Sequence, residues 1–135
     1  MKRSGIWIDK EKAYIVTIEG DIEHMETVTS HIERYRIKGG SGSRFTSGPQ
    51  DMMKDGKFLN REKQQFKNYF KDIVTKIIDT DQLVLFGPAG TNERLKSELD
   101  NNYKDISTKV KAVIKADAMT DNQIKAWVRD FFASN

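Results

Sequence analysis

The stretch RYRIKGGSGSRFTSGPQDMMKDGK, residues 34–57, divides the chain into two parts with different patterns. It is rich in glycine and serine, and its apolar residues follow neither the helical nor the strand period. Strand-like runs precede it, and helices alternating with strands follow it. An irregular connection of this length is uncommon inside a compact domain and is usually functional or disordered. We therefore expect a flexible loop over about residues 36–58 that carries the function, presented by a rigid scaffold.

The part before the loop predicts a three-stranded antiparallel meander. Residues 5–9 form a short apolar run, and residues 13–18 are dense in β-branched side chains, as is typical of strands. Residues 22–28 form a third, more polar strand that we place near an edge of the sheet. The Glu19-Gly20-Asp21 segment is typical of a hairpin turn, because glycine tolerates a positive φ angle.

The part after the loop predicts helices alternating with strands. A long helix begins with Asn60 as its N-cap, carries an apolar stripe through Phe66 and Phe70, and ends near residue 79. Thr91 or Asn92 caps a second helix that reaches about residue 99, and Thr120 with Gln123 has the spacing of a capping box for a last helix. The remaining strands cover residues 83–86, which are wholly apolar, and residues 109–115.

The order of these elements is β-β-β-loop-α-β-α-β-α. It predicts an α/β fold with a mixed sheet, as in the ribonuclease H-like fold, with residues 1–135 forming one domain. The composition agrees: 37% of the residues are hydrophobic, 32% are charged and the formal net charge is +3. We find no apolar run long enough for a membrane span, no secretion signal and no cysteine, so we expect a cytoplasmic protein without thiol chemistry.

Enzymatic sites are weakly supported. A ribonuclease H-like nuclease needs several carboxylates around Mg²⁺; Asp9 and Glu62 are candidates, but Asp81 falls at the wrong end of its strand. We interpret Asp9 as a turn residue. His24 and His31 have no serine in a nucleophile context, and residues 87–90 (GPAG) lack the residues of a phosphate-binding loop and are typical of a strand-to-helix turn. We expect no catalytic residue, metal site or cofactor.

The loop itself has the features of an RNA-binding segment. Its charged residues up to Pro49 are all basic, glycines allow close approach of the backbone to a ligand, and an aromatic ring can stack on a base. The positive charge continues along the following helix through Arg61, Lys63, Lys67 and Lys71. The predicted RNA-binding residues are Arg34, Arg36, Lys38, Gly39, Gly40, Gly42, Arg44, Phe45, Lys54 and Lys57.

Several short motifs, in this order and spacing, resemble one known family. They are residues 5–9 (GIWID), residues 38–40 (KGG) with 43–45 (SRF), residues 83–88 (LVLFGP) and residues 116–121 (ADAMTD). Over almost the whole chain they resemble the middle domain of archaeal and eukaryotic class-1 release factors and of Pelota, and most of all its small single-domain bacterial relatives. The resemblance implies a protein that acts on the ribosome.

The resemblance also implies what this chain lacks. Release factors of the family hydrolyse peptidyl-tRNA with a Gly-Gly-Gln tip, whereas Gly39 and Gly40 are followed here by Ser41, and Gln50 is too far away to take the role. The loop is nearer to that of Pelota, which acts in ribosome rescue. We therefore expect a non-catalytic protein that binds the ribosome or tRNA in rescue, stress or hibernation. A hydrolase acting on peptidyl-tRNA or RNA, and a module that binds another protein, remain alternatives, and the oligomeric state stays open.

Overall fold

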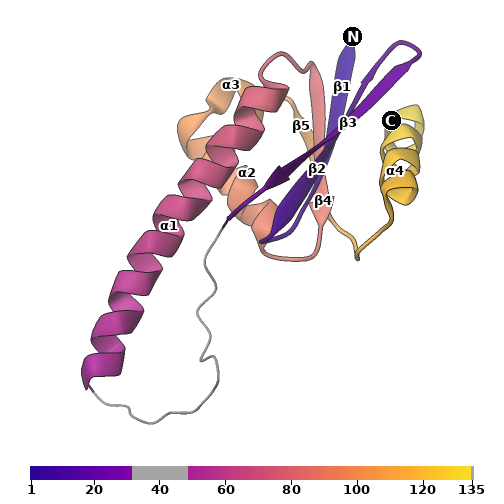
Figure 1. Ribbon diagram of the computed structural model, residues 1–135. Helices are drawn as coiled ribbons and strands as arrows, with labels where there is room; N and C mark the ends of the chain where they lie inside the picture. The colour runs from indigo at the N-terminus through magenta and orange to yellow at the C-terminus, as the bar shows by residue number, and fades with distance from the viewer. Residues whose placement is uncertain (32–48, 135) are drawn as a thin grey trace.

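The structure is a computed structural model that describes residues 1–31 and 49–134, with the backbone alone for residues 49–60 (Figure 1). Strands and helices alternate after an initial run of strands, as the sequence predicts. The elements are β1 (Lys2–Ile8), β2 (Lys12–Glu19), β3 (Ile22–Thr29), α1 (Pro49–Ile77), β4 (Gln82–Gly87), α2 (Thr91–Asn102), α3 (Lys104–Ser107), β5 (Val110–Lys115) and α4 (Asp121–Ser134).

The strands form one mixed sheet in the order β3-β2-β1-β4-β5. The meander β1–β2–β3 is antiparallel, and β4 and β5 run parallel to β1. This topology confirms the predicted α/β class with a ribonuclease H-like mixed sheet. It also confirms the edge position of β3, whose side chains are mostly exposed or half-buried.

Helices cover both faces of the sheet, with α1 and α2 on one side and α4 on the other (Figure 1). Alternate residues of the central strands therefore enter two separate cores. On β1, Ile6 and Ile8 pack beneath α1 and α2, whereas Trp7 packs beneath α4. On β4, Leu85 and Phe86 divide in the same way. Burying each such side chain contributes roughly 1.5–3 kcal/mol, and this two-sided burial explains the continuous apolar run of β4.

The last helix approaches the sheet closely at Gly5. A Cβ atom at this position would lie 2.5 Å from a methyl group of Val128, so a side chain here would require Val128 or α4 to shift. Beside this contact, Trp127 stacks on Phe86 with ring centroids 3.8 Å apart and an interplanar angle of 10°. Phe132 is buried in the same cluster, and Trp127 and Phe131 are partly buried against it.

The prediction that the loop extends to about residue 58 is wrong, because α1 begins at Pro49. Gly48, Pro49 and Gly56 suggested irregular structure. Proline is nevertheless favourable in the first turn of a helix, where its missing N–H would have no intrahelical partner. The single Gly56 costs only about 1 kcal/mol relative to alanine. Asn60 therefore lies inside the helix and does not cap it.

Two smaller features also differ from expectation. Gly90, rather than Thr91 or Asn92, is the N-cap of α2, and the short helix α3 is additional to the predicted elements. The capping box of α4 is confirmed: the Thr120 N–H donates to Gln123 Oε1 at 2.9 Å, and the Gln123 N–H donates to Thr120 Oγ1 at 3.2 Å. Within the described ranges, no helix combines the length and apolar character that a membrane span requires.

Because α4 approaches the sheet closely at Gly5, adding one methyl group at this position should have a large effect on stability. We expect Gly5→Ala to lower the free energy of unfolding by about 1–3 kcal/mol, because α4 must shift to make room. Adding Val128→Ala should recover part of the loss, since it removes the two methyl groups that the new Cβ meets. Urea denaturation of the single and double variants measures the coupling.

Gly20→Asn is the matched control for this substitution. Gly20 has a φ of 62° and open space around it, and asparagine tolerates that conformation. Its stability should stay close to that of the parent. Equal losses for Gly5→Ala with and without Val128→Ala would contradict the packing argument.

Candidate nucleic-acid interface

The ten residues that the sequence predicts to bind RNA lie outside the described residues or where only the backbone is described. Eight of them fall within residues 32–48, outside the described residues. These are Arg34, Arg36, Lys38, Gly39, Gly40, Gly42, Arg44 and Phe45. Lys54 and Lys57 lie on α1, but in the part for which only the backbone is described. All ten therefore stay predictions, and the structure describes the surface at which the chain leaves β3.

That surface is the edge of the sheet at which the parallel strands end. Thr29, the last residue of β3, pairs with Lys12, and the Ser30 N–H donates to the Glu11 carbonyl at 2.9 Å. The chain therefore leaves β3 beside the turn that follows β1. Since β1, β4 and β5 are parallel, their carboxyl ends meet at this same edge. Ligand sites of open α/β sheets commonly lie outside the carboxyl ends of the strands.

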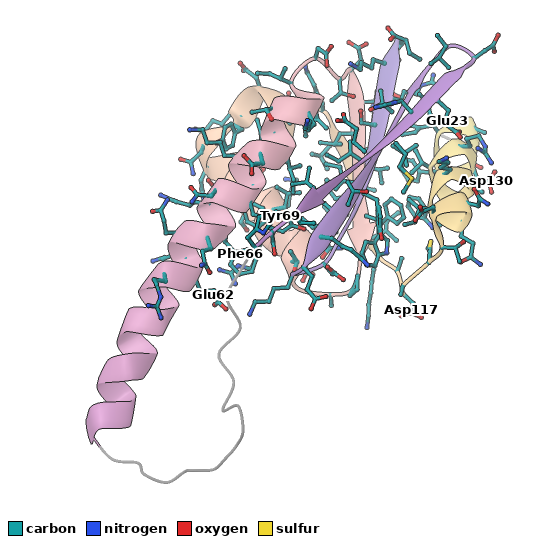
Figure 2. The ribbon with its side chains drawn as sticks, viewed as in Figure 1. Glu23, Glu62, Phe66, Tyr69, Asp117 and Asp130 are labelled. Carbon is teal, nitrogen blue, oxygen red and sulfur yellow. The ribbon has the colours of Figure 1, made fainter. Side chains whose placement is uncertain are left out.

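Helix α1 crosses this edge and is fixed to it by two polar contacts. Lys10 Nζ lies 2.6 Å from Glu62 Oε2, and the Glu62 side chain is only 14% exposed. Tyr69 follows Phe66 along α1, about one turn further on, and its hydroxyl donates to the Asp9 carbonyl at 3.0 Å. Figure 2 shows Glu62, Phe66 and Tyr69 following one another along the side of α1 that faces the sheet.

The helix is longer than the crossover between β3 and β4 requires. Its 29 residues span about 44 Å at 1.5 Å per residue. An eight-residue strand such as β3 spans only about 26 Å. The first half of α1 accordingly extends past the end of the sheet (Figure 1). The crossover between β3 and β4 does not require this half of the helix.

A line of lysines occupies the exposed side of α1 where the helix lies on the body of the protein. Lys63, Lys67 and Lys71 are all exposed and follow one another at intervals of four residues, or about 6 Å along the axis. Among the described residues, none of the three takes part in an ion pair. We call Lys63, Lys67 and Lys71 the lysine ridge. Its charge is available to a polyanion.

The carboxylates proposed for a nuclease do not converge. Asp9 Oδ1 accepts hydrogen bonds from the backbone N–H groups of Glu11 and Lys12 at 2.8 and 2.9 Å, which confirms its interpretation as a turn residue. Glu62 pairs with Lys10, and Asp81 Oδ2 accepts from the Lys2 N–H at the opposite end of the sheet. Within residues 1–31 and 49–134, no three acidic or histidine side chains are grouped as metal ligands.

The glycine-containing turn after β4 is likewise structural. Gly87 has a φ of 135°, and a Cβ there would lie 2.5 Å from the Ile8 carbonyl oxygen. The Gly90 N–H, at the start of α2, donates to Glu93 Oε1 at 3.1 Å. The turn therefore connects β4 to α2, which confirms the predicted strand-to-helix turn.

Both histidines are exposed. His24 lies 3.8 Å from Glu26, and the His31 ring is 3.0 Å from the Thr29 hydroxyl. The structure adds one cation that the sequence analysis missed. Arg94 on α2 lies over the ring of Phe66, with its guanidinium carbon 3.8 Å from the ring centroid. No local pattern could reveal it, because the contact depends on how α2 packs beside α1.

Comparison with known proteins gives solved structures of the same fold. No protein-family model and no curated protein matches the chain. Pelota from Archaeoglobus fulgidus aligns with 98% of this chain at 10% identity and a TM-score of 0.55. The archaeal translation termination factor aRF1 aligns with 98% at 8% identity and a TM-score of 0.53. A third structure, described as an archaeal protein, aligns with 99% at 9% identity and a TM-score of 0.57.

These alignments cover 36%, 39% and 34% of the three matched chains, respectively. The present chain thus corresponds to little more than a third of each protein. At identities of 8–10% the likeness shows a shared fold. The fold implied by the sequence resemblance to release factors and Pelota is therefore confirmed, and what those proteins do is a basis for proposals only.

The contact between Tyr69 and Asp9 predicts a change of stability with pH. Burial raises the pKa of the Tyr69 phenol well above its usual range, and the nearby Asp9 carboxylate raises it further. A pKa raised by folding stabilises the protein fully below the unfolded value of about 10, and that stabilisation is lost as the pH rises above it. Tyr69 should therefore make the folded state sensitive to alkali.

We expect Tyr69→Phe to cost about 0.5–1.5 kcal/mol at pH 7 through the lost hydrogen bond. Above about pH 10 its stability should fall less steeply with pH than that of the parent. Denaturant titrations of both proteins at neutral and alkaline pH test this. Parallel stability curves above that pH would show that Tyr69 ionises freely in the folded protein.

Proposed function

We propose that this protein binds RNA of the translation apparatus, on the ribosome or in tRNA, through the basic residues between positions 34 and 57 and the exposed cations of α1. The observation that carries the proposal is the lysine ridge on a helix that extends past the sheet. The fold shared with Pelota and with a translation termination factor supports the same assignment. Rescue, stress and hibernation of ribosomes are the settings that suit such a protein.

The charges at this edge support binding to a polyanion. The carboxylates Asp9, Glu62 and Glu93 each accept a hydrogen bond or pair with a cation inside the fold. The lysines of the ridge have no such partners among the described residues. The excess positive potential therefore lies on the side of α1 that faces outward, where it can attract phosphates.

Binding without hydrolysis is the form of the proposal that the residues favour. Ser41 stands where hydrolytic members of the resembled family have glutamine. Asp9, the leading candidate for a metal ligand, uses its carboxylate to hold the turn after β1. The protein would then act by occupying a site on the ribosome or tRNA, through phosphate contacts that position it.

Co-sedimentation with ribosomes at low and moderate salt tests the proposal. We expect the parent to co-sediment, and its apparent affinity should fall with salt by a log–log slope of about 0.7–0.9 per phosphate contact. Arg36→Ala with Arg44→Ala, and Lys63→Gln with Lys67→Gln and Lys71→Gln, should each weaken binding and reduce the slope.

Lys76→Gln is the matched control on the same helix. Lys76 Nζ lies 3.3 Å from Glu26 Oε1, near the end of α1 that is furthest from the loop. It should leave co-sedimentation close to that of the parent. Ribosome-free protein at every salt concentration would overturn the proposal, and capture of a partner that is insensitive to both salt and ribonuclease would favour a protein-binding module instead.

A further inference from the structure

A groove lies between α1 and α2, next to the lysine ridge. It has a volume of about 470 Å³, which is within the range of small-molecule sites. Lys63 and Lys67 line it from α1, Arg94 lines it from α2, and Gly90 lies at the start of α2. Three cations from two helices therefore face one hollow, of which the lysine ridge forms one side.

The acidic side chains of the groove are already engaged. Glu93 accepts a hydrogen bond from the Gly90 N–H at 3.1 Å, and Glu98 accepts one from the Asn102 side chain at 3.0 Å. By contrast, Lys63, Lys67 and Arg94 form no ion pair within the part of the chain that the structure describes. The groove therefore carries three cations and two carboxylates, each with one oxygen that already accepts a hydrogen bond, and this excess of positive charge favours an anionic ligand.

Arg94 is held in place by the ring of Phe66. Its guanidinium carbon lies 3.8 Å from the ring centroid, and such a contact stabilises a cation by roughly 0.5–1 kcal/mol at an exposed site. The stacking limits the motion of the side chain and leaves the N–H groups at the guanidinium edge free to donate. A planar fork of this kind matches two oxygens of one phosphate.

The aromatic residues of the groove do not offer a surface for bases. Phe66 and Phe70 are only 4% and 3% exposed, and Arg94 already lies over the ring of Phe66. A nucleic acid can therefore meet this groove through its phosphates but cannot stack a base there. Contacts of that type position a strand and carry no sequence information.

We propose that the groove between α1 and α2 binds the sugar–phosphate backbone of a single RNA strand, with Arg94 gripping one phosphate and Lys63 and Lys67 its neighbours. The inference rests on the proposed function and extends it from the basic loop to a defined second contact on the body of the protein. The strand would lie between α1 and α2, with its bases directed away from the groove.

Binding of fluorescent oligo(U) and oligo(A) RNA to the full chain over a series of salt concentrations tests this. We expect Arg94→Gln to weaken binding roughly three- to ten-fold and to lower the log–log salt slope by about 0.7. Both effects should be the same for the two oligonucleotides. Arg94→Lys should retain part of the affinity, because it keeps the charge but loses the fork. Lys63→Gln with Lys67→Gln should act in the same direction as Arg94→Gln.

Lys96→Gln is the matched control, because it removes one positive charge from the same helix outside the groove. Lys96 pairs with Asp100 at 2.7 Å and is absent from the groove lining. Circular dichroism should show that every variant keeps the parent's fold.

The outcomes separate this inference from the function on which it rests. If RNA binds and Arg36→Ala weakens it while Arg94→Gln behaves like Lys96→Gln, the groove is not a contact, although the proposed function stands. If the parent binds no RNA, both are overturned. A loss confined to one oligonucleotide would overturn contact through the backbone, and competition by poly-glutamate as effective as that by RNA would overturn RNA as the occupant.

Discussion

The central pair of parallel strands, β1 and β4, is the constraint on which the rest of the structure depends. Both strands are covered on their two faces, so helices must pack above and below them, and α4 packs closely at Gly5, which has no side chain. Parallel pairing also requires the chain to return from the end of the meander to the start of β4, which α1 accomplishes. Because of the same pairing, the carboxyl ends of β1, β4 and β5 lie at one edge of the sheet, together with the end of β3 and the start of α2.

Much of this arrangement could be predicted from the sequence because it depends on local patterns. The apolar run of β4, the stripe of α1 around Phe66 and the capping box at Thr120 each define an element through neighbouring residues. The start of α1 could not be predicted in this way, because Pro49 and Gly56 are common in loops and are tolerated here within a long helix. The role of Asp9 was recognised because side chains of its type often hold turns.

The groove between α1 and α2 is a different kind of feature. Lys63 and Arg94 are separated by thirty positions of ordinary-looking sequence, and only the packing of two helices on one face of the sheet brings them together. The sequence likewise does not reveal which acidic residues have partners, because this depends on distances between residues across the fold. The composition gives a small excess of positive charge. The structure shows that several carboxylates are engaged internally, whereas Lys63, Lys67 and Lys71 form no ion pair among the described residues. The distribution of charge at this edge thus depends on the tertiary structure.

The ion pair between Lys10 and Glu62 has a mechanical consequence. The ion pair lies where α1 extends past the body of the protein, so the first part of the helix would pivot about this contact. This part, residues 49–61, is about 20 Å long, and a tilt of about 10° at the contact would move its far end by about 3 Å. The contact between Lys10 and Glu62 therefore restrains the start of α1 at the point where the helix extends past the sheet.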